Sequence, residues 1–119
     1  MNKFISGFKY AFRGILYGIK TGMNQKIHLA AAVFAVAAGI YTGLSDIGYC
    51  VLALVIAGVF SAELFNSAIE ALSDEVCGGS QKKSIEVIKD MSAGAVLIMA
   101  IASVVTAYFL FIKPFLTKN

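Results

Sequence analysis

Three long apolar stretches dominate the pattern of hydrophobic and polar residues along the chain. They run over residues 27–44, 47–72 and 91–112. The first is polar only near its two ends, where His28 is expected to be an interfacial histidine with satisfied hydrogen bonds. The second is polar only in its last third, and the third contains no charged residue. Because a helix crosses a bilayer with about 20 mostly apolar residues, this pattern predicts three transmembrane helices.

The segment before the first apolar stretch has a helical periodicity of its own. Phenylalanine and isoleucine recur at spacings of three and four residues from Phe4 to Ile19, and the basic side chains fall largely off that stripe. The pattern predicts an amphipathic helix over about residues 3–22. A basic face beside a phenylalanine-rich face is typical of a helix at the headgroup boundary. A helix packed on the spans with its charges solvated fits equally well, and the two interpretations are compatible.

Composition places the chain in a membrane. Of its 119 residues, 59% are hydrophobic and 14% are charged, and the mean hydropathy of +0.81 lies outside the range of soluble globular domains. The surface helix and three spans use the whole chain, so we expect a single all-α membrane domain over residues 1–119. The basic residues flank membrane segments, and no soluble recognition module is present, so nothing indicates nucleic-acid binding.

The basic residues also indicate a topology. Eight of the ten lie before the first span or in the connection between the second and third spans, residues 73–90. By the positive-inside rule, the amino terminus and this connection are expected in the cytoplasm and the carboxyl terminus outside. Lys113 and Lys118 are weak evidence against that orientation. Small residues are dense in the first and third spans, which permits close helix approach and favours a homo-oligomer.

One polar stripe follows the second span toward its cytoplasmic end. Its members share one helix face, with separations of three, one, three and four residues: Glu63, Asn66, Ser67, Glu70 and Asp74. Carboxylates at membrane depth normally face a bundle interior or a water-filled site. A hydrogen-bond ladder between subunits is one explanation, but serine or a single asparagine would serve adhesion at lower cost. The two glutamates favour a divalent-cation site, because Mg²⁺ takes oxygen ligands, commonly carboxylates with substrate phosphates.

A second polar group, Lys89 and Asp90, stands at the mouth of the third span. A cation for phosphate beside an acceptor for a base or ribose is what a nucleotide site requires. Alone the pair is weak evidence, since a lysine at a cytoplasmic helix end usually reports only topology. The stretch 78–84 superficially resembles a phosphate-binding loop, but it lacks the glycine before the lysine and no strand can precede it. We interpret it as a flexible turn whose basic residues face anionic lipid.

These motifs together resemble a known signature. The string Glu63-Leu64-Phe65-Asn66-Ser67-Ala68-Ile69-Glu70-Ala71-Leu72-Ser73-Asp74, then Lys89-Asp90-Met91 and Ala93-Gly94-Ala95-Val96, resembles the prokaryotic diacylglycerol kinase family, which includes the undecaprenol kinases. The E-x-x-N-[ST]-A-I-E-x-x-x-D string is highly specific in a three-span protein, and the resemblance covers nearly the whole chain. It implies a homotrimer in the inner membrane of a prokaryote. Its active sites would lie at subunit boundaries near the cytoplasmic interface, with Mg-ATP phosphorylating a membrane lipid alcohol.

The resemblance also implies roles for individual residues. On the acceptor side, Glu63 would be the general base and Asn66 would position the reacting groups. On the nucleotide side, Glu70 would be the ligand of Mg²⁺, Lys89 would contact the phosphates and Asp90 would contact the adenine. Tyr10, on the surface helix, would lie near the nucleotide. The string Lys26-Ile27-His28 resembles the undecaprenol kinase branch somewhat more than the diacylglycerol branch, so undecaprenol is slightly favoured as the acceptor.

The chain departs from the family pattern at one position. The family usually has a second metal-binding glutamate shortly before the first span, and counting back without gaps from Glu63 puts that position at Gly22. Either activity is weakened or lost, or another residue supplies the missing ligand: Asn24, Gln25, Asp74 or Glu86. The alternative function is therefore a non-catalytic membrane protein that binds lipid or nucleotide. A small channel or transporter subunit is disfavoured, because the polar residues stop about a third of the way into the membrane.

Overall fold

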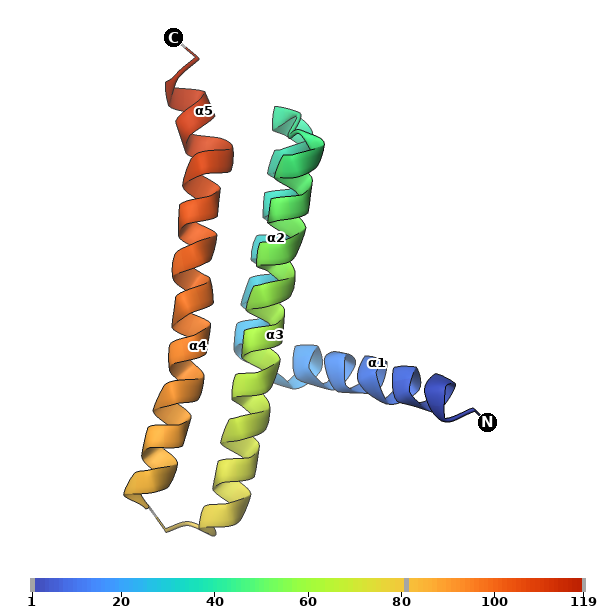
Figure 1. Ribbon diagram of the computed structural model, residues 1–119, viewed down its shortest axis with the longest axis vertical. Helices are drawn as coiled ribbons and strands as arrows, with labels where there is room; N and C mark the ends of the chain where they lie inside the picture. Colours follow the sequence, from blue (N-terminus) through green and yellow to red (C-terminus); the bar gives the residue numbers. More distant parts are fainter. Residues whose placement is uncertain (1, 81, 119) are drawn as a thin grey trace.

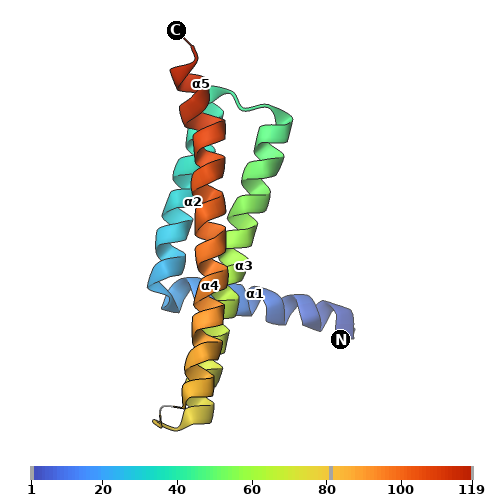
Figure 2. The same ribbon diagram turned by 60° about the vertical axis from the view of Figure 1, so that its left-hand side comes forward.

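Three long helices run side by side, and a fourth lies across them near one end (Figures 1 and 2). The computed structural model describes residues 2–80 and 82–118, so Met1, Asn119 and Gln81 of the 78–84 stretch lie outside the described residues. In chain order the elements are α1 (Lys3–Thr21), α2 (Met23–Thr42), α3 (Asp46–Cys77), α4 (Lys83–Ala107), the π-helical turn η1 (Tyr108–Ile112) and α5 (Lys113–Leu116). The described ranges contain no strand, which confirms the all-α prediction.

The helix α2, the helix α3 and the continuous helical stretch from α4 to α5 are each long and apolar enough to cross a membrane. The connection expected between the second and third spans, residues 73–90, includes the last turn of α3, which continues to Cys77, and the first turns of α4, which begins at Lys83. The predicted boundaries marked where the apolar residues end, whereas a helix can continue in water until its backbone is interrupted. That interruption is Gly78, whose φ of 52° is left-handed and whose N–H donates to the Asp74 carbonyl at 3.2 Å.

The helix α1 leaves the bundle at a sharp corner. Gly22 ends α1 and precedes α2 with extended backbone angles, φ −90° and ψ 122°, so the chain turns there. Close to this corner α1 meets α3, where a side-chain carbon at Gly18 would overlap Leu64 Cδ2. Figure 1 shows α1 running across the long axis of the bundle at this level, with α3 and α4 extending below it.

The level of α1 divides α3 into two parts. From Asp46 to Leu64 the helix is roughly 28 Å long at a rise of about 1.5 Å per residue, close to the hydrocarbon thickness of a bilayer, about 30 Å. The remaining turns, from Phe65 to Cys77, run past α1 for roughly 20 Å. The whole polar stripe beyond Glu63 therefore lies on the part of α3 that projects below α1.

At the opposite end, Gly43 and Ser45 turn the chain from α2 into α3. Gly43 has a φ of 68°, which favours glycine. The Ser45 hydroxyl then caps α3 by accepting a hydrogen bond from the Gly48 N–H at 3.2 Å. Near the carboxyl terminus, Pro114 lacks an N–H and crowds the carbonyl four residues earlier, which accounts for the wider turn η1 just before it.

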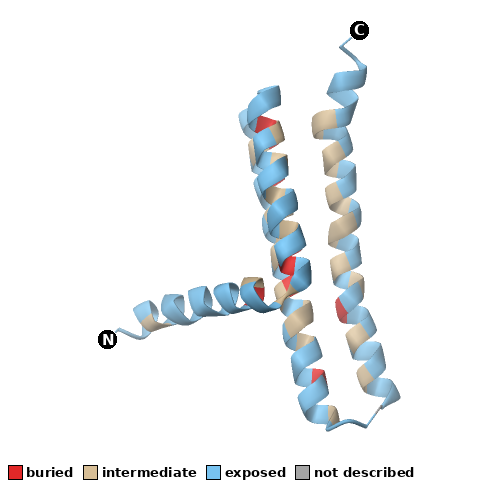
Figure 3. Cartoon of the chain, turned by 180° about the vertical axis from the view of Figure 1, so that it is seen from behind, coloured by how far each residue is buried: buried red, intermediate tan, exposed pale blue. Residues whose placement is uncertain are grey.

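Burial in the single chain is the reverse of that in a soluble protein. The buried apolar side chains of the described residues are Leu52 and Val59, whereas the buried polar ones are Gln25, Glu63, Ser73 and Ser92. Large apolar side chains such as Phe34 and Tyr41 are exposed, and exposed residues predominate along every helix (Figure 3). The radius of gyration is 17.7 Å, against about 13.5 Å for a compact domain of this length. Lipid or further protein must cover this surface.

Candidate functional site

Glu63 lies buried where α2 meets α3. Its side chain is 3% exposed, and its Oε1 is 3.0 Å from His28 Nε2 on α2. The His28 side chain is 28% exposed, so it stands between the carboxylate and the surface of the bundle. A carboxylate taken out of water must be hydrogen-bonded or paired. The expectation that His28 is a satisfied histidine at the start of the span is confirmed, and its partner is the candidate general base.

A second polar contact joins the same two helices one turn lower. Gln25 is 1% exposed, and its Nε2 donates to Ser67 Oγ at 3.0 Å and to the backbone carbonyl of Glu63 at 3.5 Å. Gln25 and His28 are three residues apart on α2, and Glu63 and Ser67 are four apart on α3, so each pair shares a helix face. We refer to these four residues as the α2–α3 clamp.

Two further members of the polar stripe are Asn66, between the clamp residues Glu63 and Ser67, and Glu70, about one turn further along α3. Asn66 Nδ2 donates to Glu70 Oε1 at 3.4 Å, whereas Asn66 Oδ1 is buried and has no hydrogen-bond partner. A buried oxygen without a partner is uncommon in folded proteins and indicates a missing ligand, ion or water. The amide oxygen and the neighbouring carboxylate are both of the ligand type that Mg²⁺ prefers.

At the lower end of the bundle, α3, α4 and the turn between them enclose a polar cleft of about 430 Å³, here called the end cleft. Its lining residues include Asp74, Glu86, Lys89 and Asp90. Lys89 Nζ donates to Asp74 Oδ1 at 3.1 Å, and the two side chains are 39% and 73% exposed. An ion pair this exposed contributes little stability, so either partner is free to exchange it for a ligand. The structure thus brings the expected phosphate and adenine contacts, Lys89 and Asp90, to one cleft.

A second hollow, the apolar groove, has a volume of about 450 Å³ and runs up the membrane-spanning part of the bundle. Alanines of α2 form one wall, and apolar side chains of α3 and of the α4–η1 stretch form the others. His28 lines its lower end, with Ala38 and Leu52 near its other end. From His28 to Ala38 the groove follows α2 for roughly 15 Å. The groove therefore leads along the lipid-facing helices to the partner of Glu63.

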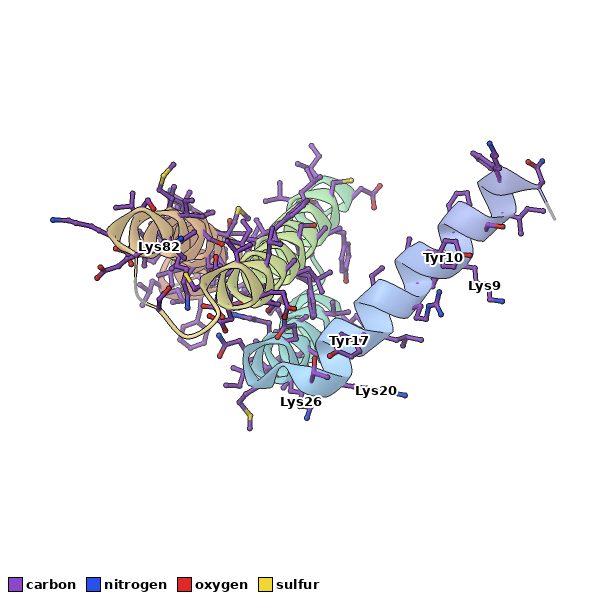
Figure 4. The ribbon with its side chains drawn as sticks, turned by 90° about the horizontal axis from the view of Figure 1, so that it is seen from below. Lys9, Tyr10, Tyr17, Lys20, Lys26 and Lys82 are labelled. Carbon is purple, nitrogen blue, oxygen red and sulfur yellow. The ribbon has the colours of Figure 1, made fainter. Side chains whose placement is uncertain are left out.

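Tyr10 is the one expected site residue that the single chain keeps away from the others. It lies on α1 with 60% of its surface exposed, and the Arg13 guanidinium lies over its ring, 5.0 Å from the centroid. Figure 4, which views the molecule from below, places Tyr10 far along α1 and Lys82, at the rim of the end cleft, on the other side of the bundle. Within the single chain, Tyr10 is therefore not among the residues that line the end cleft.

Gly22 offers no ligand, and the structure limits what can replace it. A side-chain carbon at position 22 would overlap Gln25 Oε1 and would lie 2.9 Å from the Gly18 carbonyl oxygen. Gln25 is itself engaged in the clamp, whereas Asn24 is exposed and Asp74 and Glu86 line the end cleft. Across residues 2–80 and 82–118, no group of three or more histidine, cysteine, aspartate or glutamate side chains is arranged to hold a metal ion. A metal would need substrate oxygens in addition to these side chains.

The clamp as a unit is not among the sequence predictions, which give His28 no particular partner and Gln25 only the role of a substitute metal ligand. A usable signal exists in the spacing. Because consecutive spans are antiparallel, two polar residues at the start of α2 lie level with two polar residues in the second half of α3. The register that pairs them is set by packing, which no spacing reports.

Comparison with known proteins finds the same family over most of the chain. The family model described as "Prokaryotic diacylglycerol kinase" matches residues 9–111. The "Diacylglycerol kinase" of Synechocystis sp. is 36% identical over 110 residues, which cover 92% of this chain and 63% of that protein. The "Undecaprenol kinase" of Bacillus subtilis is 34% identical over 112 residues, which cover 94% of this chain and 90% of that protein. The chain thus spans less than two thirds of the first relative and most of the second.

Proposed function

Because the chain belongs to the prokaryotic diacylglycerol kinase family, we propose that it transfers the γ-phosphate of ATP to the hydroxyl of a membrane lipid. The observation that carries the proposal is the placement of Glu63. This buried carboxylate is hydrogen-bonded to His28, which lines the lower end of the apolar groove. The polar end cleft lies further along the same helix, α3. A lipid alcohol reaches Glu63 through the groove, and a water-borne nucleotide reaches the end cleft from below.

On the acceptor side, Glu63 is the general base. His28 engages its Oε1, which leaves the second carboxylate oxygen to accept the proton of the lipid hydroxyl. The oxygen of that hydroxyl then attacks the γ-phosphorus, and ADP leaves. Phosphoryl transfer depends mainly on positioning and on electrostatic stabilisation. Asn66, one turn along α3, positions the reacting groups between the acceptor and the nucleotide.

Mg²⁺ on the nucleotide would be held by Glu70, with the unpartnered Asn66 Oδ1 as a second oxygen donor. These two oxygens fit a magnesium ion whose remaining ligands are phosphates and water, which is its usual arrangement in nucleotide sites. When bound, the ion would neutralise charge on the phosphates. With glycine at position 22, the protein supplies fewer carboxylates than the family pattern implies.

On the nucleotide side, Lys89 contacts the phosphates and Asp90 accepts a hydrogen bond from the adenine amino group. The exposed Lys89–Asp74 pair supports this assignment, because a triphosphate can displace the Asp74 carboxylate from the ammonium at little cost. Glu70 lies between Glu63 and Asp74 along α3, so the metal site falls between the acceptor and the end cleft.

We also propose an orientation and an assembly. The helix α1 lies in the headgroup region of a prokaryotic inner membrane, with the end cleft in the cytoplasm, in agreement with the basic residues at that end. The exposed apolar surface and the remote position of Tyr10 favour a homotrimer in which α1 of one copy reaches the end cleft of another. This one proposal therefore covers the position of α1 at the membrane surface, the trimer, and the contribution of two copies to each site.

Undecaprenol is the acceptor favoured by the groove as well as by the Lys26-Ile27-His28 string. The groove is lined mainly by alanine and other apolar side chains, which suits a hydrocarbon chain that carries its hydroxyl at one end. Diacylglycerol would bring two ester groups into the same surroundings, next to the hydroxyl. Burying polar groups without hydrogen-bond partners is unfavourable.

The decisive experiment measures phosphate transfer from labelled Mg-ATP by the purified protein in lipid bicelles, with undecaprenol and diacylglycerol offered in parallel. Glu63→Gln tests the base, and Glu75→Gln, on the same helix but outside the residues that line the end cleft, is the matched control. Transfer that disappears only in Glu63→Gln supports the kinase and identifies its acceptor.

The second candidate function is a non-catalytic protein that binds lipid or nucleotide, and Gly22 is the observation that favours it. Intact nucleotide binding with no transfer to either lipid would overturn the kinase proposal in its favour. The same assay on the wild-type protein therefore decides between the two.

A further inference from the structure

We propose that His28 is a positioning residue for Glu63. Its Nε2 contacts one oxygen of the carboxylate, and its imidazole lines the lower end of the apolar groove through which the acceptor hydroxyl would arrive. This inference rests on the proposed lipid kinase function of the same site, and it assigns to α2 a part in the reaction that the α3 signature does not contain.

The surroundings of Glu63 explain why a positioning partner is needed. The residue is 2% exposed, so water does not fix the orientation of its carboxylate. Within residues 2–80 and 82–118, His28 is the only side chain hydrogen-bonded to that carboxylate. A buried base without a partner would turn among several rotamers and would be costly to keep charged. His28 addresses both difficulties with one hydrogen bond at 3.0 Å.

The place of His28 in the groove is the second observation. His28 lines the lower end of the groove, and 28% of its side chain remains exposed. In the proposed mechanism, the acceptor lies in the groove with its hydroxyl toward this imidazole. A histidine in contact with both the groove and the carboxylate can couple occupation of the groove to the orientation of the base.

Gln25 holds this arrangement in register. Its Nε2 reaches the backbone carbonyl of Glu63 as well as Ser67 Oγ, so the residue that carries the carboxylate is fixed from α2 at its main chain and at its side chain. Gln25 is 1% exposed, so these contacts between α2 and α3 are shielded from water. The distance from His28 to Glu63 is thus set by the clamp as a whole.

Two substitutions of His28 test the proposal kinetically. His28→Phe keeps a ring of similar size but removes the hydrogen bond, and His28→Gln keeps a donor. We expect His28→Phe to lower kcat roughly 10- to 100-fold, because misplacement of a reacting group by about 1 Å has effects of that size. The KM for ATP should stay within about twofold, since the end cleft is not altered, and His28→Gln should recover part of kcat.

Thr42→Val is the matched control, because Thr42 lies at the other end of α2 and its hydroxyl bonds only to its own helix. Thermal melting in detergent would show whether each variant folds. A His28→Phe enzyme that keeps the wild-type kcat would overturn the proposal and leave the kinase function standing, provided that Glu63→Gln is inactive. A wild-type protein that phosphorylates neither lipid would overturn both.

A spectroscopic measurement tests the contact without turnover. His28 is the only histidine in the chain, so its ¹⁵N-labelled imidazole gives unambiguous NMR signals in bicelles. We expect the tautomer protonated on Nε2, with a slowly exchanging N–H, and we expect the signals to change in Glu63→Leu, which removes the acceptor. Identical imidazole spectra in wild type and Glu63→Leu would overturn the contact on which the proposal stands.

Discussion

The α2–α3 clamp and the end cleft differ in how completely one chain builds them. In the clamp, Glu63 and Gln25 are almost fully buried, and their polar atoms meet partners on a neighbouring helix. In the end cleft, Asp74 is exposed and Lys89 is partly exposed, and among the described residues their side chains pair only with each other. In the proposed mechanism, the acceptor side is therefore preorganised within the single chain, whereas the nucleotide side is open and has few fixed contacts.

The proposed position of α1 in the headgroup region gives this difference a physical origin, because the solvent differs on the two sides of α1. Polar groups at membrane depth must find protein partners, because lipid offers none. Polar groups below α1 have water as an alternative, so their contacts stay weak and exchangeable. The comparison predicts large effects from substitutions in the clamp that touch the base, and smaller, nucleotide-dependent effects from substitutions in the end cleft.

The largest expected effect is that of Glu63→Gln, which keeps the shape and hydrogen bonding of the side chain but removes the base. General-base catalysis typically contributes about 10²- to 10⁴-fold, so we expect kcat to fall by that factor. The fall in kcat should appear as slower phosphate transfer from labelled Mg-ATP at a saturating concentration of ATP. The KM for ATP should change little, and a fall in activity that excess ATP reverses would move Glu63 from the acceptor side to the nucleotide side.

The next effect in size is that of Lys89→Met, which keeps the length and packing of the side chain but removes its charge. A charge-assisted contact with phosphate is among the stronger hydrogen bonds, so we expect the KM for ATP to rise roughly 10-fold while kcat at saturation stays within about threefold. Titration of transfer against ATP concentration separates the two. Lys83→Met, on the same helix but outside the cleft-lining residues, is the control, and an equal rise there would point to general surface charge.

The helices and the polar stripe could be predicted from the sequence, because both depend on local periodicity. The amphipathic helix expected over residues 3–22 forms as α1 from Lys3 to Thr21. The His28–Glu63 contact could not be predicted, since it depends on the register of two antiparallel helices. The position of Tyr10 away from the end cleft also lay beyond the sequence, because it follows from the direction that α1 takes after the corner at Gly22.

A smaller effect is expected at the corner, where Gly22→Ala should displace the Gln25 side chain from the clamp. The added carbon would overlap Gln25 Oε1, and a buried amide that loses its partner destabilises the fold by about 1–3 kcal/mol. In a Gln25→Ala background the same substitution should be milder, so the two changes should not be additive. Unfolding in detergent of the four proteins measures this, and equal losses in both backgrounds would contradict the steric coupling.

The same coupling changes how the missing acid should be tested. Gly22→Glu alone would introduce a carboxylate and disturb the clamp together, so its effect on activity would have two causes. The double variant Gly22→Glu, Gln25→Ala separates them, with Gln25→Ala as its reference. We expect the double variant to exceed its reference in transfer if the site lacks a metal ligand, and to equal it if another residue already compensates.

The smallest effect expected is that of Asp74→Asn. The Asp74 side chain is 73% exposed, and the one hydrogen-bond partner of its carboxylate among the described residues is Lys89. Because so exposed a pair contributes little, stability should be unchanged and the KM for ATP should stay the same or fall by less than about threefold, since Lys89 loses a competitor for phosphate. Glu75→Gln is the control on the neighbouring residue. A rise in KM of tenfold or more in Asp74→Asn alone would show that Asp74 itself meets the nucleotide or its metal. Asp74 would then be the residue that compensates for the missing acid at position 22, and the side chains of the end cleft would be as closely constrained as those of the clamp.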